Sequence, residues 1–181
     1  PFCREPLVDD DEEHEKRELE RIKANDPAAL REMGTARYEE GDYDNAVKYW
    51  TKAAELGDPE AHYQLVDSYS KGEGVEKDEE KEVYHLEKAA IGGHPKARYN
   101  LACIETENGN IEKAVKHFII AAKLGYDTAM NALWNHFFDG NISKEDLDAA
   151  LCAHEAAINA MKSAQRDAAE RMRAEGRTSL V

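Results

Sequence analysis

One fourteen-residue pattern occurs three times in the chain and strongly limits what it can fold into. It reads KAAELGDPEAHYQL from residue 52, KAAIGGHPKARYNL from residue 88 and IAAKLGYDTAMNAL from residue 120. A recurrence every thirty to forty residues is typical of proteins built from one repeated supersecondary unit. The unit itself can be read from the spacing of its apolar residues.

Each unit predicts two helices joined by a turn. In the first helix, a buried-type alanine is followed four positions later by a larger apolar residue, and this spacing places both on one helical face. These pairs are Ala29 with Met33, Ala61 with Leu65, Ala97 with Leu101, and Ala129 with Leu133. The second helix is predicted over residues 44–57, 79–93 and 111–125. A fourth, degenerate unit follows from Tyr126 to about Met161.

The ends of these helices are marked by recurrent capping residues. Asp26-Pro27 and Asp58-Pro59 each combine an N-cap aspartate with a proline at the first helical position, and Gly57, Gly93 and Gly125 provide left-handed C-terminal caps. An ordinary helical bundle is the alternative, but a bundle has no reason to reuse its caps at a fixed period. We therefore expect an all-α fold: a right-handed α-α superhelix (solenoid) of four helix-turn-helix repeats, each stacked on the next.

The unit that follows Asp58 carries extra residues, LVDSYSKGEGVEKDEEK from Leu65 to Lys81. It resembles the Sel1-like repeat, whose pattern is matched by Ala61, Leu65, Tyr69, Gly72, Gly74, Val75, Asp78, Ala89 and Ala90. Val66 and Glu82 depart from that pattern, where the family prefers glycine and alanine. The first and third units lack the extra turn and are similar to tetratricopeptide repeats. The resemblance implies a non-catalytic protein-protein interaction scaffold or adaptor that binds a partner segment in its concave groove.

The opening residues, PFCREPL, are similar to the end of a RING finger, whose last pair of zinc ligands is Cys-Pro-x-Cys. The resemblance implies a larger protein in which this chain is the substrate- or adaptor-binding part of a RING-type ubiquitin ligase that recruits a ubiquitin-conjugating enzyme. An exposed N-terminus with no such role is the alternative. Because one cysteine cannot hold the metal, we expect no zinc site in this chain, with Cys3 a ligand only if a RING finger precedes it.

Four segments are expected along the chain. Residues 1–7 are the possible RING remnant, and residues 8–25 form an acidic linker helix or, alternatively, a functional acidic tail. Residues 26–162 form the repeat domain. Residues 163–181 form a C-terminal capping helix and tail, whose polar outer face suits the end of a solenoid.

Charge and cysteine content limit the partners and the compartment. A net charge of −14 argues against nucleic acid or an anionic membrane as partner. No apolar run reaches the roughly 18 residues that span a bilayer, so we expect no membrane insertion. Three widely separated cysteines do not form a disulfide framework. We expect a reducing, cytoplasmic environment, with the nucleus as the alternative.

No catalytic or cofactor motif is found. The sequence HEAAI, from His154, begins like a zinc-protease helix, but Ile158 occupies the position of the second histidine. There is no nucleophile elbow and no phosphate-binding loop. We expect no catalytic residues and no cofactor; an enzyme remains the alternative, as in repeat proteins with hydrolase activity, but without a supporting motif.

Candidate partner-binding residues follow from helix geometry. Positions two and six residues after each recurrent alanine point away from the packed face, at about 100° per residue. These positions hold Arg31, Thr35, Tyr63, Asp67, Tyr99, Cys103, Asn131 and Asn135. We expect Tyr63 and Tyr99 to be rigid anchors of the kind enriched at interfaces; the alternative is that both only cover neighbouring helices.

Overall fold

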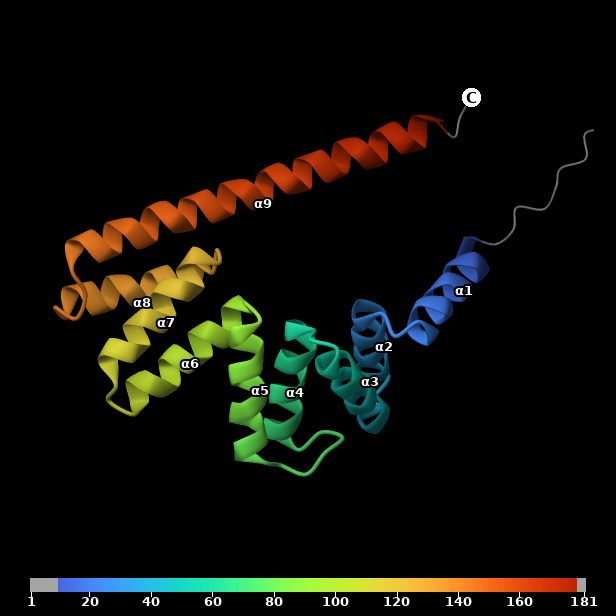
Figure 1. Cartoon of the computed structure of the whole chain (residues 1–181), viewed down its shortest axis with the longest axis horizontal. Helices are drawn as coiled ribbons and strands as arrows, with labels where there is room; N and C mark the ends of the chain where they lie inside the picture. The colour runs from blue at the N-terminus through green and yellow to red at the C-terminus, as the bar shows by residue number, and fades with distance from the viewer. Residues whose placement is uncertain (1–9, 179–181) are drawn as a thin grey trace, which may run out of the picture. The chain divides into compact units, whose positions relative to one another are not determined.

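The structure, a computed structural model, describes residues 10–178 of the 181-residue chain. All regular secondary structure in that range is α-helical, which confirms the predicted fold class (Figure 1). The helices are α1 (Asp10–Lys23), α2 (Pro27–Glu39), α3 (Tyr43–Glu55), α4 (Pro59–Lys71), α5 (Glu79–Ile91), α6 (Pro95–Glu107), α7 (Ile111–Lys123), α8 (Asp127–Phe138) and α9 (Lys144–Thr178). The predicted RING remnant, residues 1–7, lies outside the described residues and stays a prediction.

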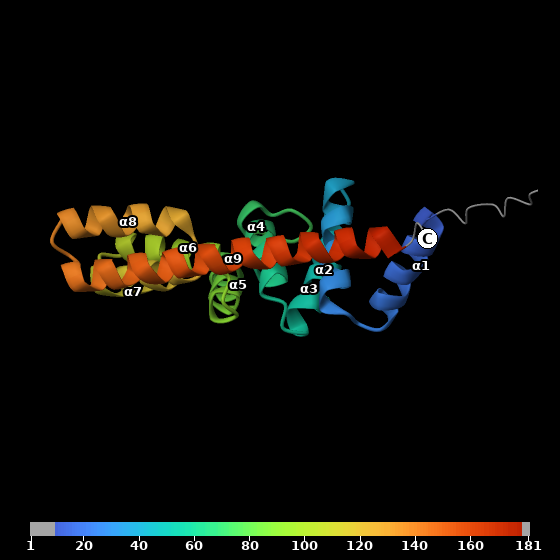
Figure 2. The ribbon, with the colours of Figure 1, turned by 90° about the horizontal axis from the view of Figure 1, so that it is seen from above.

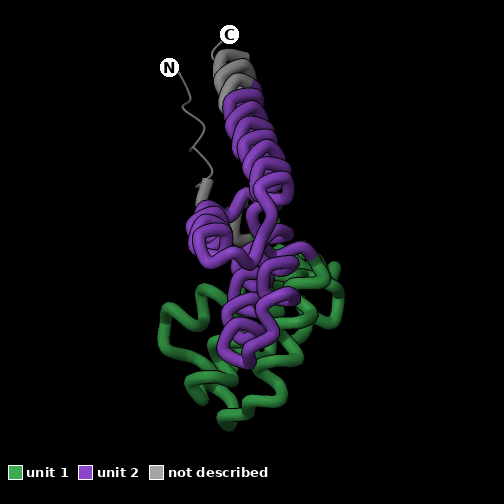
Figure 3. Tube along the Cα trace, turned by 90° about the vertical axis from the view of Figure 1, so that its left-hand side faces the viewer, with its two compact units in different colours: residues 1–92 green, residues 93–181 purple. Residues whose placement is uncertain are grey.

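The chain divides into two compact units, one ending at Gly92 and the next beginning at Gly93 (Figure 3). In unit 1, α2 pairs with α3 and α4 pairs with α5, and the two hairpins stack through α3 and α4. In unit 2, α6 pairs with α7, α7 packs on α8, and α9 lies against both α7 and α8. Each unit is therefore a stack of consecutive helix-turn-helix repeats, as the repeated sequence predicts.

The core of each unit is built around the recurrent alanines. Ala29 and Ala61 in unit 1, and Ala97 and Ala129 in unit 2, have no exposed surface. A residue this small lets neighbouring helices approach closely, and large side chains from the adjoining helices then close the core. In unit 1 these are Leu30, Trp50 and Leu65; in unit 2 they are Phe118, Leu133 and Leu147. Burying each such side chain stabilises the stack by about 1.5–3 kcal/mol.

The predicted caps are present. Asp26 and Asp58 accept hydrogen bonds at the starts of α2 and α4, from the N–H groups of Ala28 (3.0 Å) and Ala61 (2.8 Å). At the start of α6 the same position is filled by His94, whose Nδ1 accepts from the N–H of Ala97 at 3.1 Å. The glycines predicted as C-terminal caps have φ angles between 85° and 90°. The helix boundaries are thus set by local side-chain chemistry.

The extra residues of the second repeat, between α4 and α5, fold back onto the preceding hairpin. Gly74 packs directly on the backbone of Tyr43, so closely that a side chain would collide with the Tyr43 carbonyl. Val75 packs against the core of unit 1, and the hydroxyl of Tyr38 donates to Glu73 Oε2 at 2.7 Å. The insertion therefore joins two successive repeats rather than forming a free loop.

The last helix is longer than the sequence analysis predicts. α9 runs for 35 residues without a break, so the second helix of the fourth repeat and the expected capping helix are one element (Figures 1 and 2). Its first part is anchored in unit 2 through Leu147 and Ala150. Side chains at residues 162–168 are exposed. The capping role of residues 163–181 stays a prediction.

Candidate protein-interaction site

The predicted binding residues of unit 1 lie on α2 and α4, and three of them already take part in interactions. Arg31 forms an ion pair with Asp58, at 3.2 Å between Nε and Oδ2. Thr35 donates from Oγ1 to the backbone carbonyl of Arg31 at 3.1 Å. On α4, Tyr63 is half-buried and engaged in an interaction of its own, whereas Asp67 is exposed. Asp67 is thus the most accessible of the four.

The predicted residues of α6 are tied to the core of unit 2. The ring of Tyr99 lies 5.4 Å from the rings of both Phe118 and Tyr126. Burial raises the pKa of Tyr99, and a hydrogen bond to the nearby thiol of Cys103 adds to the shift. Burial also raises the pKa of Cys103, so this thiol is not an activated nucleophile. Tyr99 therefore covers neighbouring helices, whatever else it binds.

The predicted residues of α8, Asn131 and Asn135, are both exposed, and they share their helical face with two aromatic side chains that the sequence analysis missed. Trp134 is 40% exposed and Phe138 is 78% exposed. Their ring centroids are 6.2 Å apart. Phe137, which packs against the core of unit 2, contacts both rings.

We call the four residues Asn131, Trp134, Asn135 and Phe138 the α8 face. They are spaced at i, i+3, i+4 and i+7, which places them on one side of a helix. The sequence alone could have shown that these residues share a face, because Trp134 and Phe138 follow Asn131 at helical spacing, as Asn135 does.

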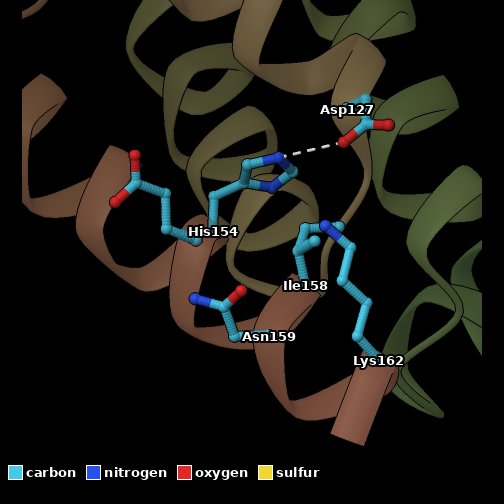
Figure 4. A pocket seen from close by; sticks show the side chains of 6 residues that line it. Asp127, His154, Ile158, Asn159 and Lys162 are labelled. Carbon is cyan, nitrogen blue, oxygen red and sulfur yellow. Dashed lines mark ion pairs between the residues drawn. The ribbon is translucent and has the colours of Figure 1, made fainter. Parts of the chain in front are cut away.

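A cavity of about 640 Å³ lies between α8 and α9, and the histidine of the HEAAI sequence lines it (Figure 4). His154 Nδ1 lies 2.9 Å from the carbonyl oxygen of Ala122, and Nε2 lies 3.0 Å from Asp127 Oδ1. Both ring nitrogens of His154 therefore face oxygen atoms of unit 2. Among the side chains that the structure describes, no group of three or more histidine, cysteine, aspartate or glutamate residues is placed to hold a metal ion.

The acidic charge of the chain is unevenly distributed between the two units. Residues 1–92 contain 26 acidic and 13 basic residues, whereas residues 93–181 contain 12 acidic and 11 basic residues. The charge that argues against a nucleic-acid partner is thus concentrated in the first half of the sequence. None of the helices in the described part of the chain is long and apolar enough to span a membrane.

Comparison with known proteins identifies the repeat. The model of the Sel1 repeat family matches residues 27–58, 59–94 and 95–126, more than half of the chain. The first and third units, which the sequence analysis likened to tetratricopeptide repeats, are matched as Sel1 repeats too. The hairpin of α8 and the start of α9 lies beyond the matched residues. Among curated proteins, none matches the chain.

Two solved structures share this fold. A Sel1 repeat protein from Oxalobacter formigenes is 25% identical, with a TM-score of 0.64 over 82% of this chain and 66% of that one. The protein c5321, a protective antigen of uropathogenic Escherichia coli strains displaying an SLR fold, is 21% identical, with a TM-score of 0.57 over 78% of this chain and 32% of that one. The chain thus spans slightly under two thirds of the first protein and about a third of the second. With three successive matches and this agreement in fold, the chain belongs to the Sel1 repeat family.

Proposed function

We propose that this chain is a non-catalytic scaffold that binds a segment of a partner protein on the exposed faces of the first helices of its repeats. Sel1 repeat folds are typical of protein-interaction scaffolds. The observation that carries the proposal is the α8 face, where Trp134 and Phe138 are exposed side by side. The concave groove expected from the sequence stays a prediction, and so does the ubiquitin-ligase context.

The chemistry of the α8 face suits a peptide segment with an apolar anchor. Large aromatic side chains are enriched at interface hot spots because they bury much area and have few rotatable bonds to immobilise. Here both rings contact Phe137, which reduces the side-chain entropy that would be lost on binding. Asn131 and Asn135 flank the rings, and each amide offers both donors and an acceptor to a peptide backbone.

The first helices of unit 1 offer a different surface. Asp67 is exposed on α4, four residues after the half-buried Tyr63, and this half of the chain carries twice as many acidic as basic residues. Basic partner segments would be attracted to such a surface, mainly through a faster association rate. We therefore propose that α8 of unit 2 takes an apolar partner segment and that α4 of unit 1, considered by itself, favours a basic one.

The test compares matched variants of the full chain as bait. Trp134→Ala and Phe138→Ala remove the aromatic surface of α8, and Ile120→Ala is the control, because Ile120 lies on the second helix α7 and is 38% exposed, against 40% for Trp134. Proteins retained from an extract of the source cells are quantified by mass spectrometry. Loss of a hot-spot residue weakens binding about tenfold or more.

We expect a specific set of retained proteins to fall at least fivefold with either α8 variant and to be unchanged with Ile120→Ala. Equal retention by all baits would contradict the assignment of the α8 face. Tyr63→Ala tests α4 in the same assay. Tyr99→Ala also removes ring contacts within unit 2, so Tyr99→Phe, which keeps the ring, is needed beside it to separate binding from packing.

A further inference from the structure

A pair of histidines joins the two helices of the second repeat. His62 on α4 and His85 on α5 face each other, with their Nδ1 atoms 2.9 Å apart. Two imidazole nitrogens at this distance need one proton between them: one ring donates and the other accepts. If both Nδ1 atoms carried a proton, the two N–H groups would point at each other. The contact therefore requires that at least one ring be neutral.

The pair lies beside a cavity of about 370 Å³ within unit 1. The ring of His85 is stacked on Tyr69, with centroids 5.4 Å apart and an interplanar angle of 12°, and meets the edge of Tyr84 at 5.1 Å. These contacts hold the ring of His85 in place, so it cannot turn away from His62 without losing packing.

The charges around the pair are mixed. Lys81 and Lys88 come from α5, each over a tyrosine ring of the same group, at 5.2 Å from the centroid of Tyr69 and 5.4 Å from that of Tyr84. Glu55 of α3 lines the cavity, and Asp58 of the turn between α3 and α4 acts on His62. The two lysines oppose a further positive charge on either ring.

These surroundings favour neutral imidazoles. Desolvation, with contributions from His62 and Lys81, lowers the pKa of His85 to about 4. Desolvation and Lys88 lower the pKa of His62, partly offset by Asp58 and by a hydrogen bond to the backbone of Ala54. The direction is the same for both rings.

The same positions hold different pairs in the neighbouring repeats. His62 is the fourth residue of α4, and His85 is the seventh residue of α5. In the first repeat these positions are Leu30 and Tyr49, both within or against the core of unit 1. In the third they are Arg98 and His117, with Nη1 and Nδ1 3.4 Å apart. Of these three pairs, the second alone consists of two histidines facing each other.

We propose that the His62–His85 pair is a pH-sensitive latch, which holds α4 against α5 at neutral pH and makes opening of the α4–α5 hairpin more frequent as the solution is acidified to about pH 5. In the closed hairpin, acidification places a charge on a ring that is partly desolvated and near two lysines, and a second proton breaks the contact between the Nδ1 atoms. In the opened hairpin both rings are solvated and accept protons freely. Protons therefore favour the opened state.

The sign follows from the difference in proton affinity. A histidine whose pKa is lower in the closed than in the open state stabilises the closed state fully above about pH 6.5, and this contribution falls as the pH drops toward the lower value. Because His85 is only partly buried, solvent screens part of this effect. The opening equilibrium of the hairpin is then expected to rise roughly tenfold between pH 7.5 and 5.0.

Two measurements on the full chain test the latch. In the first, ring resonances of the histidines are followed by NMR from pH 8 to 4, in the native chain and in urea. We expect His62 and His85 to titrate at least about one pH unit lower in the native chain than in urea. Native midpoints equal to those in urea would overturn the proposal, whatever any variant does.

In the second measurement, hydrogen exchange of the α5 amides is expressed as protection factors, which correct for the intrinsic pH dependence of exchange. The variant His62→Leu/His85→Tyr transplants the apolar pair of the first repeat, and His136→Gln, in unit 2, is the control. Protection of α5 in the wild type and the control is expected to fall about tenfold from pH 7.5 to 5.0, and less than twofold in the double variant. A double variant with the wild-type pH response would overturn the latch.

Discussion

Arg31 on α2 reaches the start of α4, where its Nε lies 3.2 Å from Asp58 Oδ2. The other carboxylate oxygen, Oδ1, accepts the N–H of Ala61 at 2.8 Å as the N-cap of α4. One side chain therefore both begins a helix and ties it to the first helix of the preceding repeat. The ion pair is only 28% and 12% exposed, so it is shielded from water more than a surface pair.

Removing this link is expected to weaken unit 1. Asp58→Ala loses the cap and the ion pair and should lower the free energy of unfolding by about 2 kcal/mol, whereas Arg31→Met loses the ion pair alone and should cost about 1 kcal/mol or less. In the double variant the loss should be smaller than the sum, because both changes break one contact. Urea unfolding followed by circular dichroism measures all three. Asp67→Ala changes an exposed residue of α4 and is the control. If the losses of unfolding free energy in Asp58→Ala and Arg31→Met add up strictly in the double variant, Arg31 and Asp58 do not interact.

The insertion of the second repeat offers a sharper test of local packing. Gly74 and Gly41 both have left-handed backbone, with φ of 73° and 82°, but Gly74 abuts the backbone of Tyr43 while nothing lies near Gly41. Alanine at either position strains the backbone by about 1 kcal/mol, and at Gly74 it also forces the insertion away from α3. We expect Gly74→Ala to lower the free energy of unfolding by about 2 kcal/mol or more, measured in urea, and Gly41→Ala by about 1 kcal/mol. Equal effects would mean that the insertion does not pack tightly on the preceding hairpin.

The fold was predictable because burial is periodic in this sequence. Ala29, Ala61, Ala97 and Ala129 recur at the same position of each repeat and are all fully buried. The length of α9 was the exception. From Lys144 to Glu175 the sequence contains neither glycine nor proline, so no stop signal separates the fourth repeat from the C-terminal segment, and the helix continues.

The exposure of the candidate binding residues was harder to predict, because a position that points away from a helix's own packed face can still meet another element. Arg31 meets a cap that is 27 residues away in the sequence, and Tyr99 meets Phe118 and Tyr126. The pairing of His62 with His85 likewise depends on how α4 and α5 lie against each other. The periodicity of a single helix carries no information about that arrangement. Asn131 and Asn135, in contrast, are exposed, as their positions on α8 predict.

The cysteines of unit 2 should differ in reactivity. Burial raises the pKa of Cys103, and its side chain is only partly exposed, whereas Cys152 on α9 is exposed. Since the thiolate is the reactive form, iodoacetamide at pH 8 is expected to modify Cys152 about ten times faster than Cys103. Mass spectrometry of peptides from the native chain gives both rates, and the urea-unfolded chain, where the two rates should converge, is the control. Equal rates in the native chain would show that α6 does not protect its thiol.

The aspartate caps predict a second pH dependence, at lower pH than that of the histidines and in the same direction, because the pKa of Asp78 is also lowered in the folded state. At the start of α5, the N–H of Lys81 donates to Asp78 Oδ1 at 3.0 Å, and this bond lowers the pKa of Asp78 below 3.8. A carboxyl whose pKa is lower in the folded state stabilises the fold fully above its unfolded pKa and loses that effect as the pH falls through the folded value. Asn at this position keeps a capping oxygen but does not titrate. The wild type should therefore exceed Asp78→Asn in free energy of unfolding at about pH 6, and the difference should shrink by about pH 3, as measured in urea. Asp67→Asn, which changes an exposed aspartate, is the control. If the wild type and Asp78→Asn differ by the same amount at both pH values, the charge of Asp78 does not stabilise the start of α5.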